Sequence, residues 1–192
     1  MKKKIITGMI ILALLVGISL RIVYVNSILP KYEVKEGGLN KKIEMYGVEV
    51  SVYKCSYKIL GEEAEEVNDF IKIYNTDEYF SKDDMAVSVY VTLTNTTDEP
   101  LDVYLSEFTL VYDASFSFPN FAFAKYSTYN GGTARYLEPG QTINTVICYV
   151  LDKERYENVD KFEDEMDVNL DWLLYPNKIR INLEKMNMES GE

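Results

Sequence analysis

Hydrophobic and polar residues alternate along residues 85–95, MAVSVYVTLTN. Every second residue from Met85 to Leu93 is apolar, and the residues between them are mostly small or hydroxylated. A period of two is typical of a β-strand with one face against a hydrophobic core and the other toward water. The polar stretch TTDEP then follows at residues 96–100. The pattern therefore predicts a half-buried strand that ends in a turn.

Similar alternation recurs along much of the chain after residue 46. It predicts strands at 47–60, 85–95, 101–105, 107–113, 142–152 and 177–184. In the first of these, the apolar positions change phase after Val52, which indicates a bulge or a shift between sheets. About seven short strands separated by polar turns such as LEPGQ (137–141) predict an all-β fold, an antiparallel β-sandwich.

Residues 61–78 interrupt the strand pattern. Apolar residues recur there at helical spacing, from Ala64 and Val67 to Tyr74, and acidic residues crowd the first turn. We expect a short helical insertion near residues 63–74.

The N-terminus carries a long apolar run. Ile5 to Leu20 is uncharged over 16 residues, and the run reaches 21 residues if it continues to Val25. Such a helix is about 31 Å long, which is enough to cross a bilayer. Three lysines at positions 2–4 outweigh Arg21, so the positive-inside rule leaves the N-terminus in the cytoplasm. A cleaved signal peptide is the alternative, although no A-x-A site follows the run.

These features divide the chain into a transmembrane signal anchor (1–28), a stalk (29–42) and a β-sandwich (43–192). Pro30 and the Gly37-Gly38 pair favour irregular structure in the stalk. The expected location is the cell membrane, with a single crossing and the C-terminal domain extracellular.

The chain resembles the immunoglobulin-like domains of uncharacterised surface proteins from Gram-positive bacteria. The residues that carry the resemblance are KKKIITGMII with RIVYVN, VSVYVTLTNTTDEPL, LEPGQ and YPNKIRINL. The resemblance implies an immunoglobulin-like sandwich at the cell surface, and it implies no chemistry. Many members of this group are lipoproteins, whereas no cysteine stands at the end of the apolar run here.

Charge and composition narrow the classes of function. After residue 30 the chain holds 16 basic and 31 acidic side chains, a net charge of −15, so we expect no nucleic-acid partner. Histidine is absent, which removes the commonest general base and zinc ligand. We therefore expect no cofactor and no enzymatic activity. The alternative is a cell-envelope enzyme that uses paired carboxylates from residues 62–66 or 163–167.

Two further patterns allow alternative interpretations. Residues 167–171 (DVNLD) match the first half of a calcium loop, but Trp172 replaces the required glycine, so a strand or turn at the surface is the other interpretation. Cys55 and Cys148 both lie in predicted strands. They are either buried thiols or a candidate disulfide, which an extracellular location would permit.

Residues 114–132 are rich in aromatic side chains and contain Pro119, which predicts an edge strand and a loop. Aromatic residues on a loop suit a protein partner or a cell-wall glycan. The alternative is that the phenylalanines cap the core. The candidate partner surface consists of Phe121, Phe123, Tyr126 and Tyr129. The predicted function is that of a non-catalytic, membrane-anchored binding module.

Overall fold

The computed structural model describes residues 2–28, 32–73, 79–112, 115–128, 132–152, 168–174, 176–183 and 187–188. For residues 2–13, 28, 174 and 187–188 the description covers the backbone alone. The chain divides into two compact units, Met1–Glu33 and Val34–Glu192.

The first unit contains helix α1 (Lys2–Ile28). Among the residues described, no helix combines the length and the apolar character that crossing a membrane requires. The membrane-spanning role expected for this segment therefore stays a prediction that rests on the sequence.

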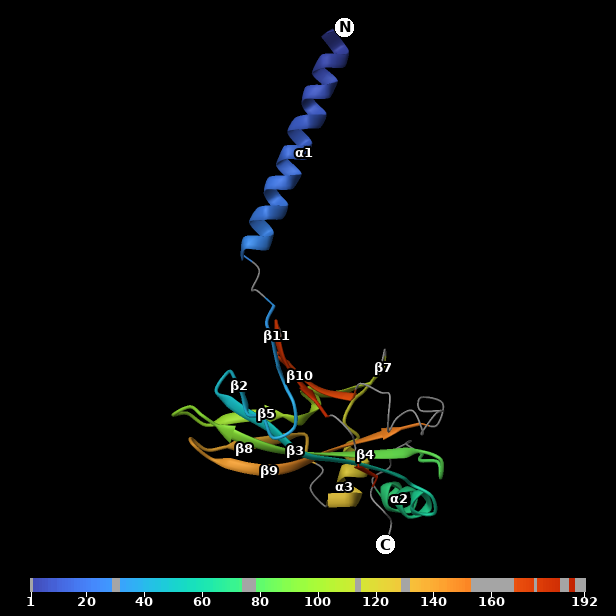
Figure 1. The fold of residues 1–192 in the computed structure, drawn as a ribbon. Helices are drawn as coiled ribbons and strands as arrows, with labels where there is room; N and C mark the ends of the chain where they lie inside the picture. The colour runs from blue at the N-terminus through green and yellow to red at the C-terminus, as the bar shows by residue number, and fades with distance from the viewer. Residues whose placement is uncertain are drawn as a thin grey trace. The chain divides into compact units, whose positions relative to one another are not determined.

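The second unit consists of short strands with helices inserted between them (Figure 1). Its elements in chain order are β1 (Val34–Gly37), β2 (Ile43–Met45), β3 (Val48–Ile59), α2 (Glu63–Lys72), β4 (Met85–Asn95), β5 (Leu101–Tyr104), the 3-10 helix η1 (Leu105–Glu107), β6 (Phe108–Tyr112), β7 (Ser115–Ser117), α3 (Phe121–Thr128), β8 (Ala134–Leu137), β9 (Thr142–Leu151), β10 (Val168–Leu174), β11 (Asn177–Asn182) and β12 (Asn187–Met188).

The strands form two main sheets that pack against each other. Within the described residues, sheet A has the order β1-β11-β10-β6-β7 and sheet B the order β12-β3-β4-β9, with β2 also paired to β3. Neighbouring strands run antiparallel except for β1 with β11 and β12 with β3. Strands β5 and β8 form a separate antiparallel ribbon. The predicted antiparallel β-sandwich with a short helical insertion is confirmed.

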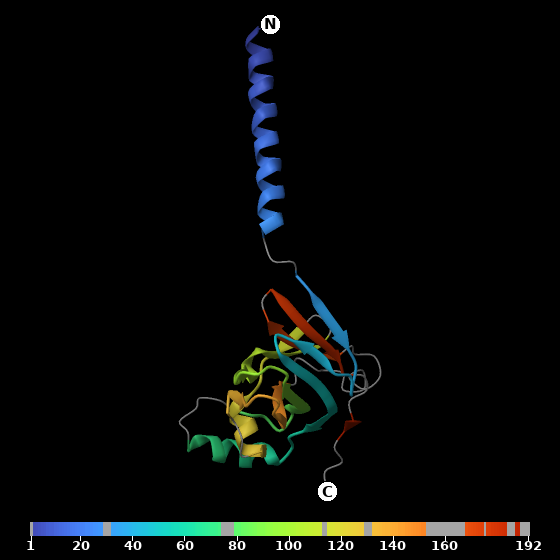
Figure 2. The ribbon, with the colours of Figure 1, turned by 90° about the vertical axis from the view of Figure 1, so that its left-hand side faces the viewer.

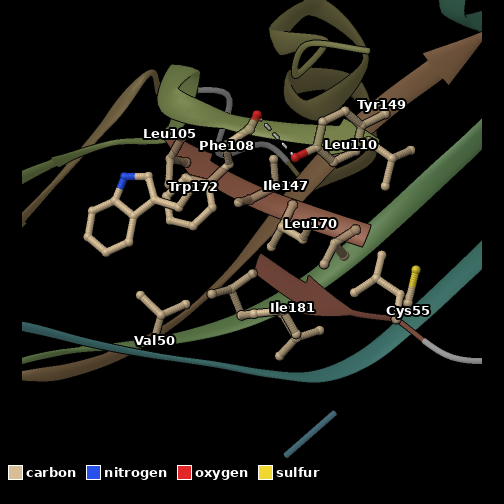
Figure 3. Packing of buried hydrophobic residues seen from close by; sticks show 14 of the residues in the cluster. Val50, Cys55, Leu105, Phe108, Leu110, Ile147, Tyr149, Leu170, Trp172 and Ile181 are labelled. Atoms are coloured by element: carbon tan, nitrogen blue, oxygen red, sulfur yellow. Dashed lines mark hydrogen bonds between the residues drawn. The ribbon is translucent and has the colours of Figure 1, made fainter. Parts of the chain in front are cut away.

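The main core fills the space between the two sheets (Figure 3). The apolar positions of β4 from Met85 to Leu93 are fully buried, as their alternation predicted. From sheet A, the ring of Trp172 stacks on Phe108 with centroids 5.0 Å apart. The Tyr149 hydroxyl donates a hydrogen bond of 3.3 Å to the Phe108 carbonyl, so that a buried tyrosine links the two sheets.

The opposite face of sheet B is only partly exposed to solvent. Thr92 is half-buried there and its hydroxyl donates to Asn144 Oδ1 at 2.8 Å. Toward the other end of the same strand, Ala86 is buried in a second apolar cluster that α2 and α3 complete. Figures 1 and 2 show both helices on the side of sheet B that faces away from β10 and β11. The prediction that this face of β4 is exposed to solvent is therefore correct for only one half of the strand.

Three local features of the structure agree with the predictions made from the sequence. The register between β3 and β4 shifts between Val52 and Lys54, which is the predicted bulge. Helix α2 confirms the helical insertion. The turn at 137–141 is closed by a hydrogen bond from the Gln141 amide to the Glu138 carbonyl, 3.0 Å long.

Two expectations were wrong in part. The stalk predicted at 29–42 contains β1, whose residues pair in parallel with β11, so the folded unit begins at Val34. The segment 114–132 does contain the predicted edge strand, which is β7 at one edge of sheet A, but helix α3 follows it where a loop was expected. Asn120 begins this helix, because its side-chain oxygen accepts a hydrogen bond of 2.8 Å from the Phe123 amide, the usual N-cap contact.

Candidate functional site

The expected partner surface lies largely in the core. Phe123 is 1% exposed and belongs to the cluster beneath α2 and α3. Phe121 is partly buried against the main core. These two positions correct the prediction of an exposed surface, because Phe123 packs in the second cluster and Phe121 packs against the main core. Tyr129 lies outside the described residues.

Tyr126 is partly buried between the two helices. Its hydroxyl donates to Glu66 Oε2 at 3.2 Å, and its ring lies 5.6 Å from that of Phe70. Burial, together with the nearby carboxylates of Glu63 and Glu66, raises the pKa of Tyr126 to about 12. The side chain therefore helps to join α3 to α2.

The two cysteines are buried thiols that no disulfide joins, which corrects the candidate disulfide. Cys55 lies on β3 and Cys148 on β9, with β4 between the two strands. Cys55 faces the main core, whereas Cys148 faces the second cluster under the helices. Side chains on opposite faces of a sheet and two strands apart cannot meet. Burial raises the pKa of the Cys55 thiol to about 12, so it stays protonated at neutral pH.

Three carboxylates at the start of α2 and just before it are held in ion pairs. Glu63 lies 2.7 Å from Lys58, and Lys82 lies 2.8 Å from Glu62 and 2.9 Å from Glu65. The second acidic run, residues 163–167, lies outside the described residues. In the segment considered for calcium, Asn169 and Asp171 are part of strand β10, which confirms the strand, but both side chains are buried and not at the solvated surface that was expected.

A different site is present on the outer face of sheet A. Core and outer positions alternate along β6 and β10, so that Phe108, Leu110, Leu170 and Trp172 face the core. Thr109, Val111, Asp171 and Leu173 face the other way because the side chains of a strand alternate. Together with residues of β7 and the loop after it, they line a hollow of about 370 Å³, which we call the sheet A hollow. Its lining residues are Thr109, Val111, Ser115, Phe116, Phe118, Asp171 and Leu173.

Asp171 is the charged group of the sheet A hollow, and it is 3% exposed. Arg180 donates two hydrogen bonds to its carboxylate, Nε to Oδ1 at 2.8 Å and Nη2 to Oδ2 at 2.7 Å. Lys178 Nζ donates a third to Oδ2 at 3.0 Å. Burial by itself would raise the pKa of Asp171, but these donors and their positive charges outweigh it and lower the pKa below its ordinary value. The carboxylate is therefore ionised at neutral pH.

The Thr109 side chain is a buried polar group of strand β6. The residue is 4% exposed, and its side-chain oxygen Oγ1 has no hydrogen-bond partner among the described residues. A buried hydroxyl without a partner costs about 1–3 kcal/mol of stability. Such groups are rare in folded proteins and call for an explanation, of which a ligand that supplies the partner is one.

Two phenylalanines form the open wall of the sheet A hollow. Phe116 and Phe118 are 56% and 59% exposed, and their rings meet edge to face with centroids 5.4 Å apart. Large apolar side chains that gather on a surface often mark a binding site. Both residues belong to the aromatic segment 114–132, but they precede the residues that the sequence singled out.

Part of this site could have been found in the sequence. The alternation of FTLVY (108–112) and VNLDW (168–172) already separates the outward Thr109 and Asp171 from the core residues. The sequence does not reveal that β6 and β10 are neighbours, which brings these two residues together, because they lie about sixty positions apart in the chain.

No protein-family model matches the chain, and no curated protein does. Several solved structures from Gram-positive bacteria are similar to it. An uncharacterised β-sandwich protein from Clostridium difficile is 11% identical, with 81% of this chain and 98% of that chain covered and a TM-score of 0.46. The yjhA protein from Bacillus subtilis is 11% identical, with 77% and 99% covered and a TM-score of 0.49. A functionally unknown protein from Listeria monocytogenes is 8% identical, with 70% and 69% covered and a TM-score of 0.45.

Proposed function

We propose that this protein is a non-catalytic binding module at the outer surface of a cell membrane, and that the sheet A hollow is its binding site. The observation that carries the proposal is the buried Thr109 hydroxyl, which has no hydrogen-bond partner in the part of the chain that the structure describes and lines a hollow walled by two exposed phenylalanines. Ligand sites combine an apolar lining with a few polar groups in this way.

The chemistry of the hollow suits binding better than catalysis. Asp171 is ionised and held by two cations, so it is a poor proton donor at neutral pH. The cross-strand neighbour of Thr109 is this same carboxylate, and its hydrogen bonds with Arg180 and Lys178 already engage it. The groups can therefore orient a ligand through hydrogen bonds and apolar contact.

The membrane location in this proposal rests on the sequence. Residues 5–20 form an uncharged run behind three lysines, which favours an N-terminus in the cytoplasm and residues 34–192 outside. The strongly acidic domain favours a protein or cell-wall glycan as partner over nucleic acid. The immunoglobulin-like character suggested by the sequence belongs to the same proposal.

Saturation-transfer NMR on the full-length chain in detergent micelles tests the binding site. Three classes of small probe are offered separately at millimolar concentration, namely simple sugars, amino acids and small aromatic acids. The wild type is compared with the Phe116→Ala/Phe118→Ala double variant and with Tyr136→Ala, a control whose side chain is equally exposed, at 57%, on a different strand.

The proposal predicts that at least one probe class binds to the wild type and to the control and is lost in the double variant. Binding that survives in the double variant, or the failure of every class to bind to the wild type, would contradict it.

A further inference from the structure

We infer that the ligand of the sheet A hollow is a neutral saccharide ring. This inference rests on the proposed function and names the ligand class of the same site. Three properties of the hollow support it: its balance of charge, its hydrogen-bonding groups and its aromatic wall.

The charges around the hollow balance within a strongly acidic domain. Along the outer face of sheet A, Glu36 is the cross-strand partner of Arg180, which is in turn the partner of Asp171. Lys178 also contacts Asp171, so two cations surround this carboxylate, and Glu36 follows beyond Arg180 on the neighbouring strand. A cationic ligand would meet Arg180 and Lys178 beside Asp171, the one carboxylate among the described residues that line the hollow. An anionic ligand would approach a domain of high negative charge and contact that carboxylate. The local charge thus favours a neutral ligand.

The hydrogen-bonding groups call for a ligand that both donates and accepts. A carboxylate offers about four acceptor positions, and the three donors from Arg180 and Lys178 occupy three of those on Asp171. Thr109 Oγ1 can donate one hydrogen bond and accept others. Sugar hydroxyls donate and accept at the same atom, so neighbouring hydroxyls on one ring suit this pair of groups.

The aromatic wall calls for an apolar face on the same ligand. Phe116 and Phe118 present ring surface to solvent, and Leu173 is 48% exposed beside them. A sugar ring carries C–H groups on its faces and hydroxyls around its edge. A purely apolar ligand would leave Thr109 unsatisfied, and a purely polar ligand would leave the phenylalanines uncovered. A volume of about 370 Å³ lies at the small end of ligand sites, which fits one or two sugar rings.

A series of sugars that share one ring and differ in charge tests the inference. The probes are glucose, glucuronic acid and glucosamine, with cellobiose as a longer neutral sugar and free phenylalanine as an aromatic amino acid that is not a sugar. Dissociation constants are measured by NMR titration of the full-length chain in detergent micelles, for the wild type, Phe116→Ala and Tyr136→Ala.

We expect glucose or cellobiose to bind about tenfold more tightly than either charged sugar, a difference of about 1.4 kcal/mol. Phe116→Ala should weaken the neutral sugars about tenfold, while Tyr136→Ala should leave them unchanged. Equal or tighter binding of glucuronic acid or glucosamine would overturn the inference. Binding of phenylalanine without any sugar would overturn it and leave the proposed function standing. If no probe binds, both fail.

Discussion

Thr109 and Asp171 lie directly opposite each other on β6 and β10, on the outer face of sheet A. Their neighbourhoods differ, because Asp171 receives hydrogen bonds from Arg180 and Lys178 whereas the Thr109 hydroxyl has no partner among the described residues. A fold selected for stability alone would place an apolar residue at position 109. We interpret the hydroxyl as a group kept for a ligand, and several measurements follow from this interpretation.

Alanine substitutions should divide the aromatic residues of the segment 115–128 into core residues, whose loss lowers stability, and surface residues, whose loss does not. Phe123→Ala removes a fully buried ring and should lower the free energy of unfolding by about 3–5 kcal/mol. Phe116→Ala removes an exposed ring and should change it by less than about 0.5 kcal/mol. Chemical denaturation of both variants measures these values. A large loss of stability in Phe116→Ala would mean that this ring belongs to the packing of the fold.

The contribution of Asp171 to stability should depend on pH. Its folded-state pKa lies below the ordinary value near 4, so its contribution is present above that pH and is lost as the pH falls through the folded-state pKa. Asp171→Asn leaves Arg180 and Lys178 without their carboxylate and should cost roughly 3 kcal/mol at pH 7. Melting curves of the wild type and the variant should converge as the pH falls below about 4. A difference that stays constant down to pH 2 would contradict this account.

The sandwich could be predicted because several of its strands alternate. The core positions of β4 are visible as apolar residues at every second place, the bulge in β3 as a change of phase, and β9 as an apolar run that is buried on both faces. Strand β1 was missed because its four residues, VKEG, carry no alternating apolar pattern and owe their structure to pairing with β11. Helix α3 was missed because its cap, Asn120, was counted as part of a loop.

The site was less predictable than the fold. The sequence analysis chose candidate residues by the density of aromatic side chains. This criterion identified the segment that holds Phe116 and Phe118, but the residues chosen from it were later ones, in and after α3. Whether an aromatic side chain is exposed depends on which face of α3 contacts sheet B, and that follows from tertiary packing. The unsatisfied hydroxyl of Thr109 can be recognised only when its surroundings are known.

The stability of the protein should not depend on whether its cysteines are kept under oxidising or reducing conditions. Cys55 is buried with a pKa of about 12, and the two thiols face different clusters. We expect the melting temperature to be the same with and without a reducing agent, and thiol reagents to leave Cys55 unlabelled in the native protein. A disulfide closing so long a loop would contribute about 4–5 kcal/mol. A drop of several degrees on reduction would therefore show that the cysteines pair.

The proposed location can be tested with protease on intact cells from which the wall has been removed. We expect the domain that begins at Val34 to be digested and a short N-terminal fragment to stay with the membrane. A cytoplasmic marker protein should remain intact as the control. Full protection of the domain, or full-length protein in the culture medium, would contradict the proposed anchor.

The most direct test of the central claim is the substitution Thr109→Val, measured for stability and for binding in the same preparation. Valine keeps the shape of threonine and removes only the hydroxyl, so the ligand-free protein should gain about 1 kcal/mol in the free energy of unfolding. Ligand affinity should fall at the same time, because the ligand loses a hydrogen bond inside the sheet A hollow. A variant that is more stable and binds less well is the result that we predict. If Thr109→Val is less stable than the wild type, or if it binds the ligand equally well, the hydroxyl serves the fold and the claim is wrong.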